Sequence, residues 1–367
     1  MVGQAGMQAG GNKMLKRIAI QVGYVCVVFG LISMPILAGV TKDLSFSTSY
    51  NNNILRDSNS QGDYITQLKG SVAWGYRKER SQAQFYYSGT GYMFAEIGSR
   101  SFALNGVGVS YVRQFANAKR FQAGSFASVR LDRAGSEAYD NLGWKSYVAF
   151  RMYLPYSIVL NSGYTVQLRN YWHMDARNYS DHTASLQMSK LLSTQTLIRA
   201  DAGYGLKHHS DSEGQIVLGL ELSQPLAQNT SLSTRFERRL NTHANAFGQN
   251  ILDQDIDKLN SRYDYSGQVW SAKLTQQLTH RRQLVIAGGV DVRHYQTLTT
   301  LAWRGEPLFA DELRKDKNPY LSIAFETPLG NRVNAQFIYD FESNKSNDTF
   351  FHFGKRNSLS VDLGLSF

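Results

Sequence analysis

Basic and phenolic side chains recur at every second position in the middle of the chain. Within "LGWKSYVAFRMYL", Lys145, Tyr147, Arg151 and Tyr153 occupy odd positions, and most of the even positions are apolar. Cationic side chains attract anionic groups, and a Tyr ring offers a flat apolar face together with a hydroxyl, which suits stacking on sugar rings. This spacing indicates a surface that can bind a polar solute.

Charged residues at equivalent positions are mainly basic in the first half of the chain and mainly acidic in the second. The basic set comprises Lys69, Arg77, Arg120, Arg130, Lys145, Arg151, Arg169, Arg199 and Lys207. The second set comprises Glu221, Glu237, Asp291, Glu326, Asp340, Glu342 and Asp362, with Arg293 as a basic member. Two interpretations stay open, because these charges either neutralise one another or create a field that attracts an anionic solute.

Tyrosine is abundant, with 21 residues, and many of these rings share the parity of the charged side chains. They are Tyr86, Tyr92, Tyr147, Tyr153, Tyr171, Tyr263, Tyr265, Tyr295 and Tyr320. Such rings either stack on a sugar or fill a narrow interior by packing on one another. The sequence is compatible with both interpretations.

One short run carries the residue types of a hydrolase, namely His208, His209, Ser210 and Asp211. Consecutive loop residues do not constitute a triad, because nucleophile, base and orienting group are assembled by the fold. The aspartates of "DQDIDK" resemble the start of a calcium loop, but Lys258 occupies the position where the turn requires Gly. We therefore predict that the chain is not an enzyme and has no cofactor, no metal site and no nucleic-acid partner.

The elements that must position these residues show a period of two. In "YITQLKGSVAWGY", Leu68, Val72 and Trp74 alternate with Gln67 and Lys69. Such segments run about 10–15 residues, whereas a soluble strand has about 5–6. A tilted strand crosses a bilayer with about 9–11 residues. The length favours membrane-crossing strands over those of a soluble sandwich.

Sixteen such strands can be placed on the chain, at roughly 43–53, 63–77, 81–95, 100–115, 119–132, 140–154, 157–172, 180–191, 195–208, 213–224, 230–240, 263–279, 282–296, 318–327, 331–342 and 349–367. Tight turns alternate with longer loops, of which 241–262 and 297–317 are the longest. An even number of strands with short turns on one side predicts an all-β transmembrane antiparallel up-and-down β-barrel. Counts of 14 and 18 strands stay open, and the strand at 100–115 has no clean parity. We expect a short helix that begins at Pro307.

The N-terminal region predicts a signal peptide within residues 1–38, which leaves a barrel domain at 39–367. Lys16 and Arg17 precede a mostly apolar run that ends in small residues. An uncleaved membrane anchor is the alternative, and Met14 is an alternative start. No later segment is long and apolar enough for a transmembrane helix, and the mean hydropathy is −0.35.

The chain ends on an amphipathic strand, "LSVDLGLSF", whose final residue is Phe367. This pattern resembles the bacterial outer-membrane β-barrel class, in which a C-terminal aromatic strand is the signal for the assembly machinery. The resemblance implies that Phe367 is an assembly signal. The last strand should pair with the first, because an open sheet edge in hydrocarbon leaves backbone groups unpaired at several kcal/mol each.

A second resemblance lies in the first hairpin, "SYNNNILRDSNSQGDYITQLKGSVAWGY". It is similar to the opening hairpin of the BBP2-type outer-membrane β-barrel family, whose first strand typically ends in a Tyr-Asp/Asn-x-Asn-hydrophobic-x-Arg pattern. Tyr50, Asn51, Asn53, Ile54 and Arg56 match this pattern, with Asn51 where Asp is commoner. Several members of that family sit in exopolysaccharide synthesis and export loci, so the resemblance implies glycan passage.

Together these features predict a barrel in the outer membrane of a Gram-negative bacterium that passes a hydrophilic solute, with exopolysaccharide export as one form of that role. The two charged sets, with Tyr147, Tyr153 and Tyr171, are expected to line the lumen. The expected partners are outer-membrane lipid, lipopolysaccharide, the barrel-assembly machinery and a saccharide or small hydrophilic solute. A structural barrel whose outer loops 241–262 and 297–317 bind a partner is the alternative.

Overall fold

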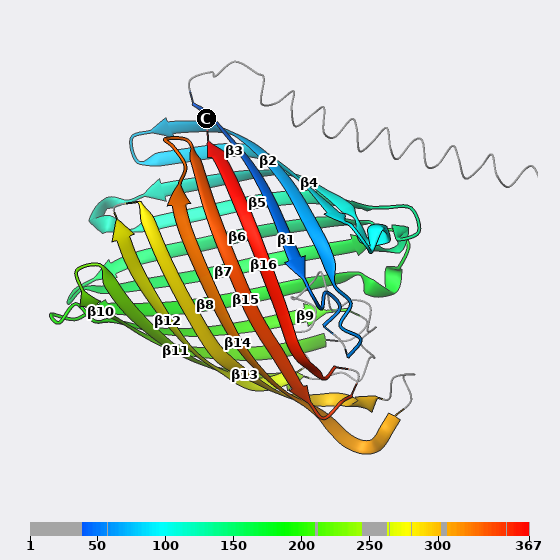
Figure 1. The fold of residues 1–367 in the computed structure, drawn as a ribbon. Coiled ribbons are helices and arrows are strands. Elements are labelled where there is room, and N and C mark those ends of the chain that lie inside the picture. Colours follow the sequence, from blue (N-terminus) through cyan, green and yellow to red (C-terminus); the bar gives the residue numbers. More distant parts are fainter. Residues whose placement is uncertain are drawn as a thin grey trace, which may run out of the picture.

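The described part of the chain forms one ring of antiparallel strands (Figure 1). The computed structural model describes residues 39–56, 58–209, 212–243, 263, 265–279, 281–301, 307–349 and 351–366. These residues contain sixteen strands, β1 (Val40–Asn51), β2 (Asp63–Lys78), β3 (Ser81–Phe94), β4 (Phe102–Gln114), β5 (Arg120–Asp132), β6 (Asn141–Leu154), β7 (Ile158–Tyr171), β8 (Tyr179–Leu191), β9 (Leu197–His208), β10 (Ser212–Ala227), β11 (Thr230–His243), β12 (Tyr265–Thr279), β13 (Arg282–Leu301), β14 (Pro307–Pro328), β15 (Val333–Ser346) and β16 (Phe353–Ser366).

The sheet closes because β1 pairs with both β2 and β16. Phe46 lies opposite Leu68 of β2 and Leu363 of β16, and each strand from β2 to β15 pairs with its two neighbours in sequence. Closure removes the unpaired edge that hydrocarbon does not tolerate. The predicted sixteen-stranded up-and-down barrel is confirmed.

The motif at the end of β1 makes contacts with the last two strands, next to the place where β1 pairs with β16. Asn53 is fully buried, and its carbonyl oxygen accepts a hydrogen bond from Arg356 Nε at 3.1 Å. The Arg56 guanidinium lies 3.2 Å from Glu342 of β15. Because residues of the first hairpin contact the last two strands, the motif that resembles the BBP2-type family has a structural role at closure.

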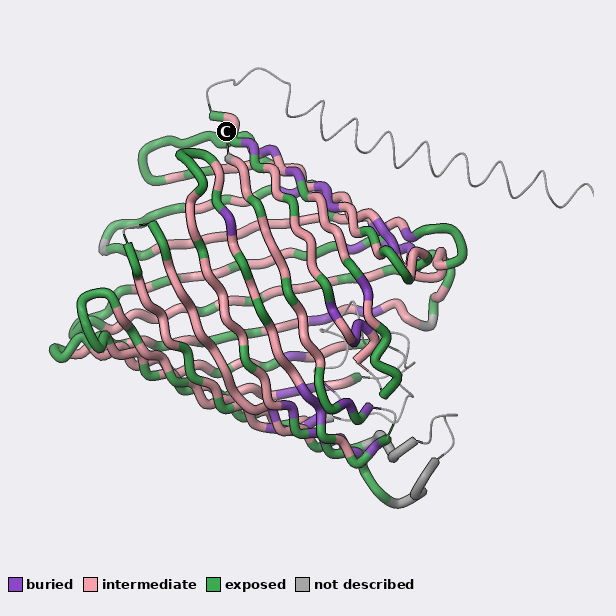
Figure 2. Tube along the Cα trace, in the orientation of Figure 1, coloured by how far each residue is buried: buried purple, intermediate pink, exposed green. Residues whose placement is uncertain are grey.

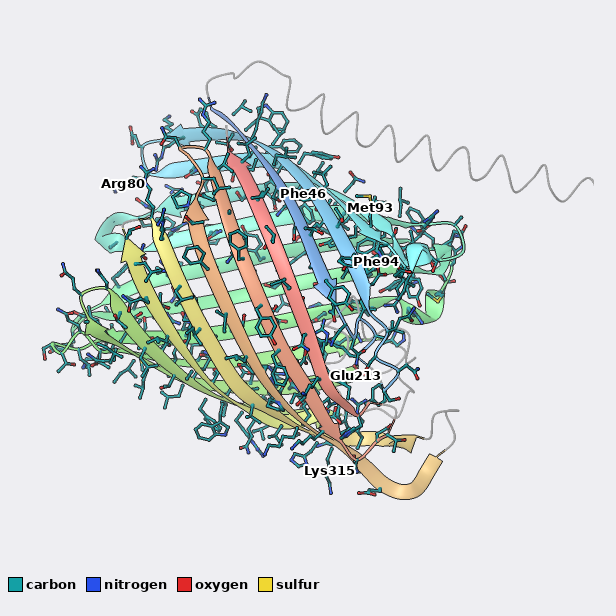
Figure 3. All side chains as sticks on the ribbon, viewed as in Figure 1. Phe46, Arg80, Met93, Phe94, Glu213 and Lys315 are labelled. Atoms are coloured by element: carbon teal, nitrogen blue, oxygen red, sulfur yellow. The ribbon has the colours of Figure 1, made fainter. Side chains whose placement is uncertain are left out.

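Large apolar side chains share one parity on each strand and form the outer face. Leu218, Leu220 and Leu222 of β10 are exposed at successive even positions, and Figure 3 shows side chains such as Phe46 and Met93 on the barrel wall. Four tryptophans are exposed as well, Trp74, Trp144, Trp172 and Trp270. An apolar exterior of this kind suits contact with lipid.

The two ends of the barrel differ in their connections. Tight turns such as 79–80 lie at the end where β1 begins and β16 ends, and longer links such as 52–62 lie at the other (Figure 1). Short 3₁₀ helices lie in three of these longer links, at Gly98–Arg100, Glu137–Tyr139 and Asp175–Arg177. Buried residues gather toward the long-loop end (Figure 2). In outer-membrane barrels the short turns face the periplasm.

The structure explains why the fourth strand lacks an alternating sequence. On β4 the outward positions are occupied by Val107, Val109 and Tyr111, which are exposed, whereas Gly106 and Gly108 face inward. Because glycines occupy inward positions where other strands have polar side chains, the sequence of this strand shows no alternation between apolar and polar residues.

One of the two long loops expected from the sequence is different in the structure. The segment 297–317 lies mostly in strands, because β13 continues to Leu301 and β14 begins at Pro307. The predicted helix from Pro307 is therefore wrong. An isolated helix of this length is marginal, and the ladder between β13 and β14 supplies the backbone hydrogen bonds instead. The predicted signal peptide, residues 244–262 of the other loop and Phe367 lie outside the described residues.

Candidate functional site: the inner wall of the barrel

The side chains that alternate with the outer apolar residues form the inner wall. Residues directly opposite each other in an antiparallel pair point to the same face. Lys145, for example, lies opposite Phe126 and Gln167, while its exposed neighbour Trp144 faces outward.

By this rule, the register places the predicted strand residues on the inner face: Lys69, Arg77, Arg120, Arg130, Lys145, Tyr147, Arg151, Tyr153, Arg169, Tyr171, Arg199, Lys207, Glu221, Glu237, Asp291, Arg293, Glu326, Asp340 and Asp362. The role of these residues in lining a pore stays a prediction.

On β9 to β11 the inner charges form a network, which we call the paired network: Arg199, Asp201, Glu221, Arg235, Glu237 and Arg239. Arg235 donates to both carboxylate oxygens of Asp201, at 2.8 and 3.0 Å, and to Glu237 at 3.1 Å. Arg199 Nη1 donates to Glu221 Oε2 at 2.9 Å. Each carboxylate in this network has at least one guanidinium partner, so the charges neutralise one another locally.

The paired network continues onto β12 and β13 through an aromatic ring. Arg239 bonds to both Glu237 and the Tyr265 hydroxyl, and the Arg293 guanidinium lies 4.9 Å from the centre of the Tyr265 ring. Arg293 also donates to Asp291 at 2.7 Å. A guanidinium over a ring gains further electrostatic stabilisation, so the cations of this part of the wall interact with groups of the wall itself.

On β2 to β6 five inner cations have no such partners, whereas Arg130 of β5 is paired with Asp132 at 2.7 Å. We call Lys69, Arg77, Arg120, Lys145 and Arg151 the basic arc. None of them has a carboxylate of a described residue within ion-pair distance. Their cross-strand neighbours are instead residues such as Phe126, Gln167 and Thr90. Positive charge in this part of the wall is therefore available to a solute.

Two arginines of the basic arc lie directly opposite each other. Arg120 of β5 is the register partner of Arg151 of β6, and like charges in such a pair repel. Arg151 donates to Asn161 Oδ1 at 2.6 Å, whereas Arg120 Nε is buried and makes no hydrogen bond within the described structure. The pair lies near the short-turn end of the barrel, where an anion would relieve the repulsion.

Three carboxylates lie on β14 to β16, on the other side of the ring. Glu326 and Asp362 both lie opposite Gln336, and Asp340 lies opposite Ser322 and Ser358. None of the three makes an ion pair with a described residue. We call these three residues the acidic arc. In a closed ring of this strand order β14 stands across from β6, so the acidic arc lies on the opposite side of the ring from part of the basic arc.

Aromatic rings lie flat against glycines on the inner face of β3 to β6. A Cβ atom at Gly108 would lie 2.4 Å from the Tyr86 ring, and one at Gly124 would lie 2.6 Å from the Tyr147 ring. The Tyr86 and Phe126 rings are stacked, with centroids 5.8 Å apart. Each of these rings therefore lies close to the backbone of the inner face, where a side chain in place of the glycine would displace it.

The residues with hydrolase chemistry do not come together in the described structure. His208 ends β9 on the outer parity, where its Nδ1 lies 2.7 Å from Ser212 Oγ, and His209 Nδ1 lies 2.7 Å from the carbonyl oxygen of Asn178. Ser210 and Asp211 lie outside the described residues, as do the aspartates of "DQDIDK". No group of three metal-ligating side chains occurs among the residues that the structure describes.

Sequence reasoning missed several residues of the inner wall. Asp201, Arg235 and Arg239 complete the paired network, and Gly108 and Gly124 seat the aromatic rings. The parity of the charged residues was visible in the sequence. Which strand positions meet, however, depends on the register between strands, and no pattern within one strand specifies it.

Comparison with solved structures shows that the chain has the fold of bacterial outer-membrane β-barrels. A structure described as a bacterial polysaccharide outer membrane secretin aligns with 89% of this chain and 97% of its own, at 10% identity and a TM-score of 0.52. Pseudomonas aeruginosa OccK5 (OpdH) aligns with 91% of this chain and 100% of its own, at 10% identity and a TM-score of 0.54.

A third structure gives the same result. Pseudomonas aeruginosa OccD3 (OpdP) aligns with 91% of this chain and 92% of its own, at 10% identity and a TM-score of 0.52. The resemblance to the outer-membrane β-barrel class, drawn from the C-terminal strand, is thus confirmed at the level of the fold. No family model and no curated protein sequence matches the chain, so the resemblance to the BBP2-type family stays a prediction.

Proposed function

We propose that this protein is a channel of the outer membrane that passes a hydrophilic solute carrying anionic groups. The observation that carries the proposal is the pair Arg120 and Arg151, directly opposite on the inner wall with no carboxylate partner. Such a pair is unfavourable in an empty wall. It becomes favourable when an anionic group passes between the two guanidinium groups, since lumenal charge sets the selectivity of a channel.

A saccharide is the solute class that fits the rest of this wall. Tyr86, Phe126 and Tyr147 lie on the inner face of β3, β5 and β6, where Phe126 is the register partner of Lys145. Tyr hydroxyls and ring faces together suit sugar rings, and the neighbouring cations suit carboxylate or phosphate substituents. Export of an exopolysaccharide is the finer form of this proposal, and the first-hairpin resemblance through Tyr50 to Arg56 supports it.

A docking barrel is the second candidate, favoured by one observation. β13 and β14 have 20 and 22 residues, whereas their neighbour β12 has 15. Their hairpin extends past the rest of the long-loop end (Figure 1). A projecting hairpin offers a contact surface for another protein at the cell exterior. Lipopolysaccharide and the barrel-assembly machinery stay predicted partners under both candidates.

Planar-bilayer recording of the purified chain separates these candidates. The channel predicts stepwise conductance that an anionic oligosaccharide blocks more strongly than a neutral oligosaccharide of the same length. The variant Arg120→Gln/Arg151→Gln should lose this difference and stay conducting. Absence of conductance, even after deletion of 246–260, would indicate a plugged barrel and would support the docking candidate. Co-purification of one stable partner that is lost on shortening the β13–β14 hairpin would support it further.

A further inference from the structure

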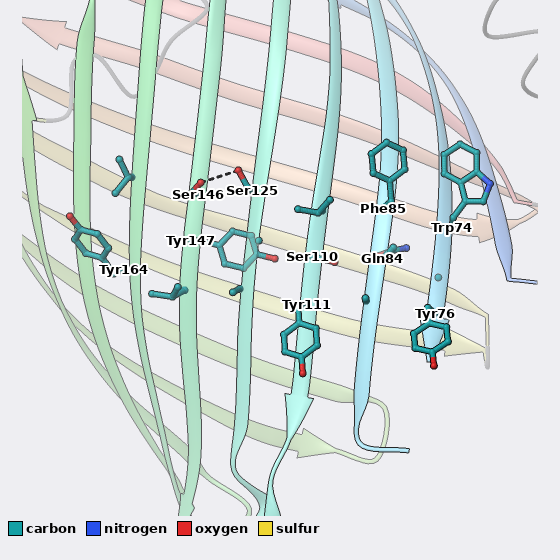
Figure 4. A pocket seen from close by; sticks show the side chains of 17 residues that line it. Trp74, Tyr76, Gln84, Phe85, Ser110, Tyr111, Ser125, Ser146, Tyr147 and Tyr164 are labelled. Atoms are coloured by element: carbon teal, nitrogen blue, oxygen red, sulfur yellow. Dashed lines mark hydrogen bonds between the residues drawn. The ribbon is translucent and has the colours of Figure 1, made fainter. Parts of the chain in front are cut away.

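A groove of about 770 Å³ lies on the outer face of the barrel across β2 to β7 (Figure 4). Its sides are aromatic, from Trp74, Tyr76, Phe85, Tyr111 and Tyr164. Its floor consists of small side chains, from Ala83, Ala123, Ser125 and Ser146. These five aromatic residues carry the outward parity of their strands and are exposed, so the groove opens toward lipid. Three inward residues, Gln84, Ser110 and Tyr147, also border it.

The register explains why this part of the surface is hollow. Tyr76 and Tyr111 both lie opposite Ala83, and Tyr111 also lies opposite Ala123. A small residue therefore separates neighbouring rings along one row of the sheet. In the next row the Trp74 and Phe85 rings lie 5.6 Å apart, and Ser125 and Ser146 follow, joined by a hydrogen bond of 3.0 Å. Small residues between large ones leave space for a flexible apolar chain.

The short-turn end of this groove carries a basic rim, which we define as Lys78, Arg80 and Arg113. Lys78 and Arg113 both lie opposite Ser81, one outward row beyond the tyrosines. Arg80 lies in the turn between β2 and β3 (Figure 3). All three are exposed, and no carboxylate of a described residue, including the adjacent Glu79, makes an ion pair with them.

We propose that the groove and its basic rim form a binding site for an anionic phospholipid of the periplasmic leaflet. The lipid phosphate lies at Lys78, Arg80 and Arg113, and an acyl chain fills the groove below. The charge pattern selects this ligand, because a cationic rim at the membrane surface attracts an anionic headgroup and the apolar groove accepts only its tail. A second copy of the chain is a poorer occupant, since a two-fold contact would bring two basic rims together.

Native mass spectrometry of the full chain, released from detergent, tests this site. The two probes are phosphatidylglycerol and phosphatidylcholine with identical acyl chains. We expect phosphatidylglycerol to be retained preferentially. The variant Lys78→Gln/Arg80→Gln/Arg113→Gln should reduce its retention by about a hundredfold and leave that of phosphatidylcholine unchanged. The variant Ala83→Leu/Ala123→Leu, which fills the groove and keeps the rim, should also reduce retention.

The matched control removes three exposed arginines at other turns of the same end, in Arg281→Gln/Arg282→Gln/Arg332→Gln. Heat-modifiable migration on gels establishes that each variant has folded. Equal loss of phosphatidylglycerol in the control would overturn the site in favour of diffuse surface attraction. Equal retention of the two lipids would overturn the site as well. So would the observation of lipid-free dimers that form with the wild-type chain and not with the rim variant. Because the groove faces lipid, its result is independent of solute passage through the lumen.

Discussion

The basic arc and the paired network consist of the same kinds of residue and have opposite arrangements. In the paired network, Arg235 meets Asp201 and Glu237 within 3.1 Å, whereas Arg120 in the basic arc meets Arg151. Each region lies on the inner face of consecutive strands, the basic arc on β2 to β6 and the paired network on β9 to β11. An inward cation forms ion pairs when carboxylates occupy the adjacent inward positions. When they do not, we expect the cation to stay available to a solute.

Reversing charge in the basic arc should give the largest change. The variant Lys69→Glu/Lys145→Glu/Arg151→Glu replaces three unpaired cations with three acids, so the preference for anions should become a preference for cations. The zero-current potential across a KCl gradient in a planar bilayer measures this. The same substitutions at Arg281, Arg282 and Arg332, which are exposed at the short-turn end beyond the middle of the barrel wall, should leave the sign unchanged. An unchanged sign in the lumenal variant would show that the basic arc does not face the ion path.

Removing a cation from the paired network should instead change stability. Arg235→Ala leaves Asp201, Glu221 and Glu237 short of a partner, and since the side chain is 31% exposed we expect a loss of about 1–3 kcal/mol in the free energy of unfolding. Urea unfolding in lipid vesicles measures it. Arg151→Ala, in the basic arc, should cost much less. Equal losses of unfolding free energy in Arg235→Ala and Arg151→Ala would contradict the distinction between the paired network and the basic arc.

Displacing an aromatic ring should have an intermediate effect on solute binding. Gly124→Ala places a Cβ atom 2.6 Å from the Tyr147 ring, so the ring must leave the wall. Block of the channel current by an oligosaccharide should weaken about threefold. Gly364→Ala is the control, because Gly364 also faces inward and has no atom within 4 Å of the added Cβ. Unchanged block in Gly124→Ala would exclude Tyr147 from the sugar path.

Salt should have the smallest effect, acting through screening. The Debye length falls from about 10 Å at 0.1 M to about 3 Å at 1 M, so the anion preference should decrease over this range. The decrease should be weaker in Arg120→Gln/Arg151→Gln, where less charge remains to be screened. Zero-current potentials at several mean salt concentrations give the comparison. A preference that does not depend on salt would point to pore size as its cause.

The fold could be predicted from the sequence because each strand repeats one simple pattern. The outward residues of β10, for example, are leucines at every second position, and length alone separates such strands from those of a soluble sandwich. The long β13–β14 hairpin could not be predicted, since residues near Pro307 and Leu313 have no strong alternation. There the pairing of the two strands determines the structure.

The inner face could be predicted, but its division into regions could not. Parity places Lys145 and Glu221 on the same face of the sheet. It does not indicate which of the two has an oppositely charged partner on a neighbouring strand. That difference depends on the register, which brings Arg199 opposite Glu221 and Lys145 opposite Phe126. The glycines that seat aromatic rings depend on register in the same way.

The ion selectivity of the wild-type chain is the decisive test of whether the basic arc attracts anions into the lumen. In a planar bilayer with a KCl gradient, the wild-type chain should conduct, and its zero-current potential should have the sign for chloride permeating faster than potassium. A conducting channel that prefers potassium, or a purified and folded chain that never conducts, would contradict the account.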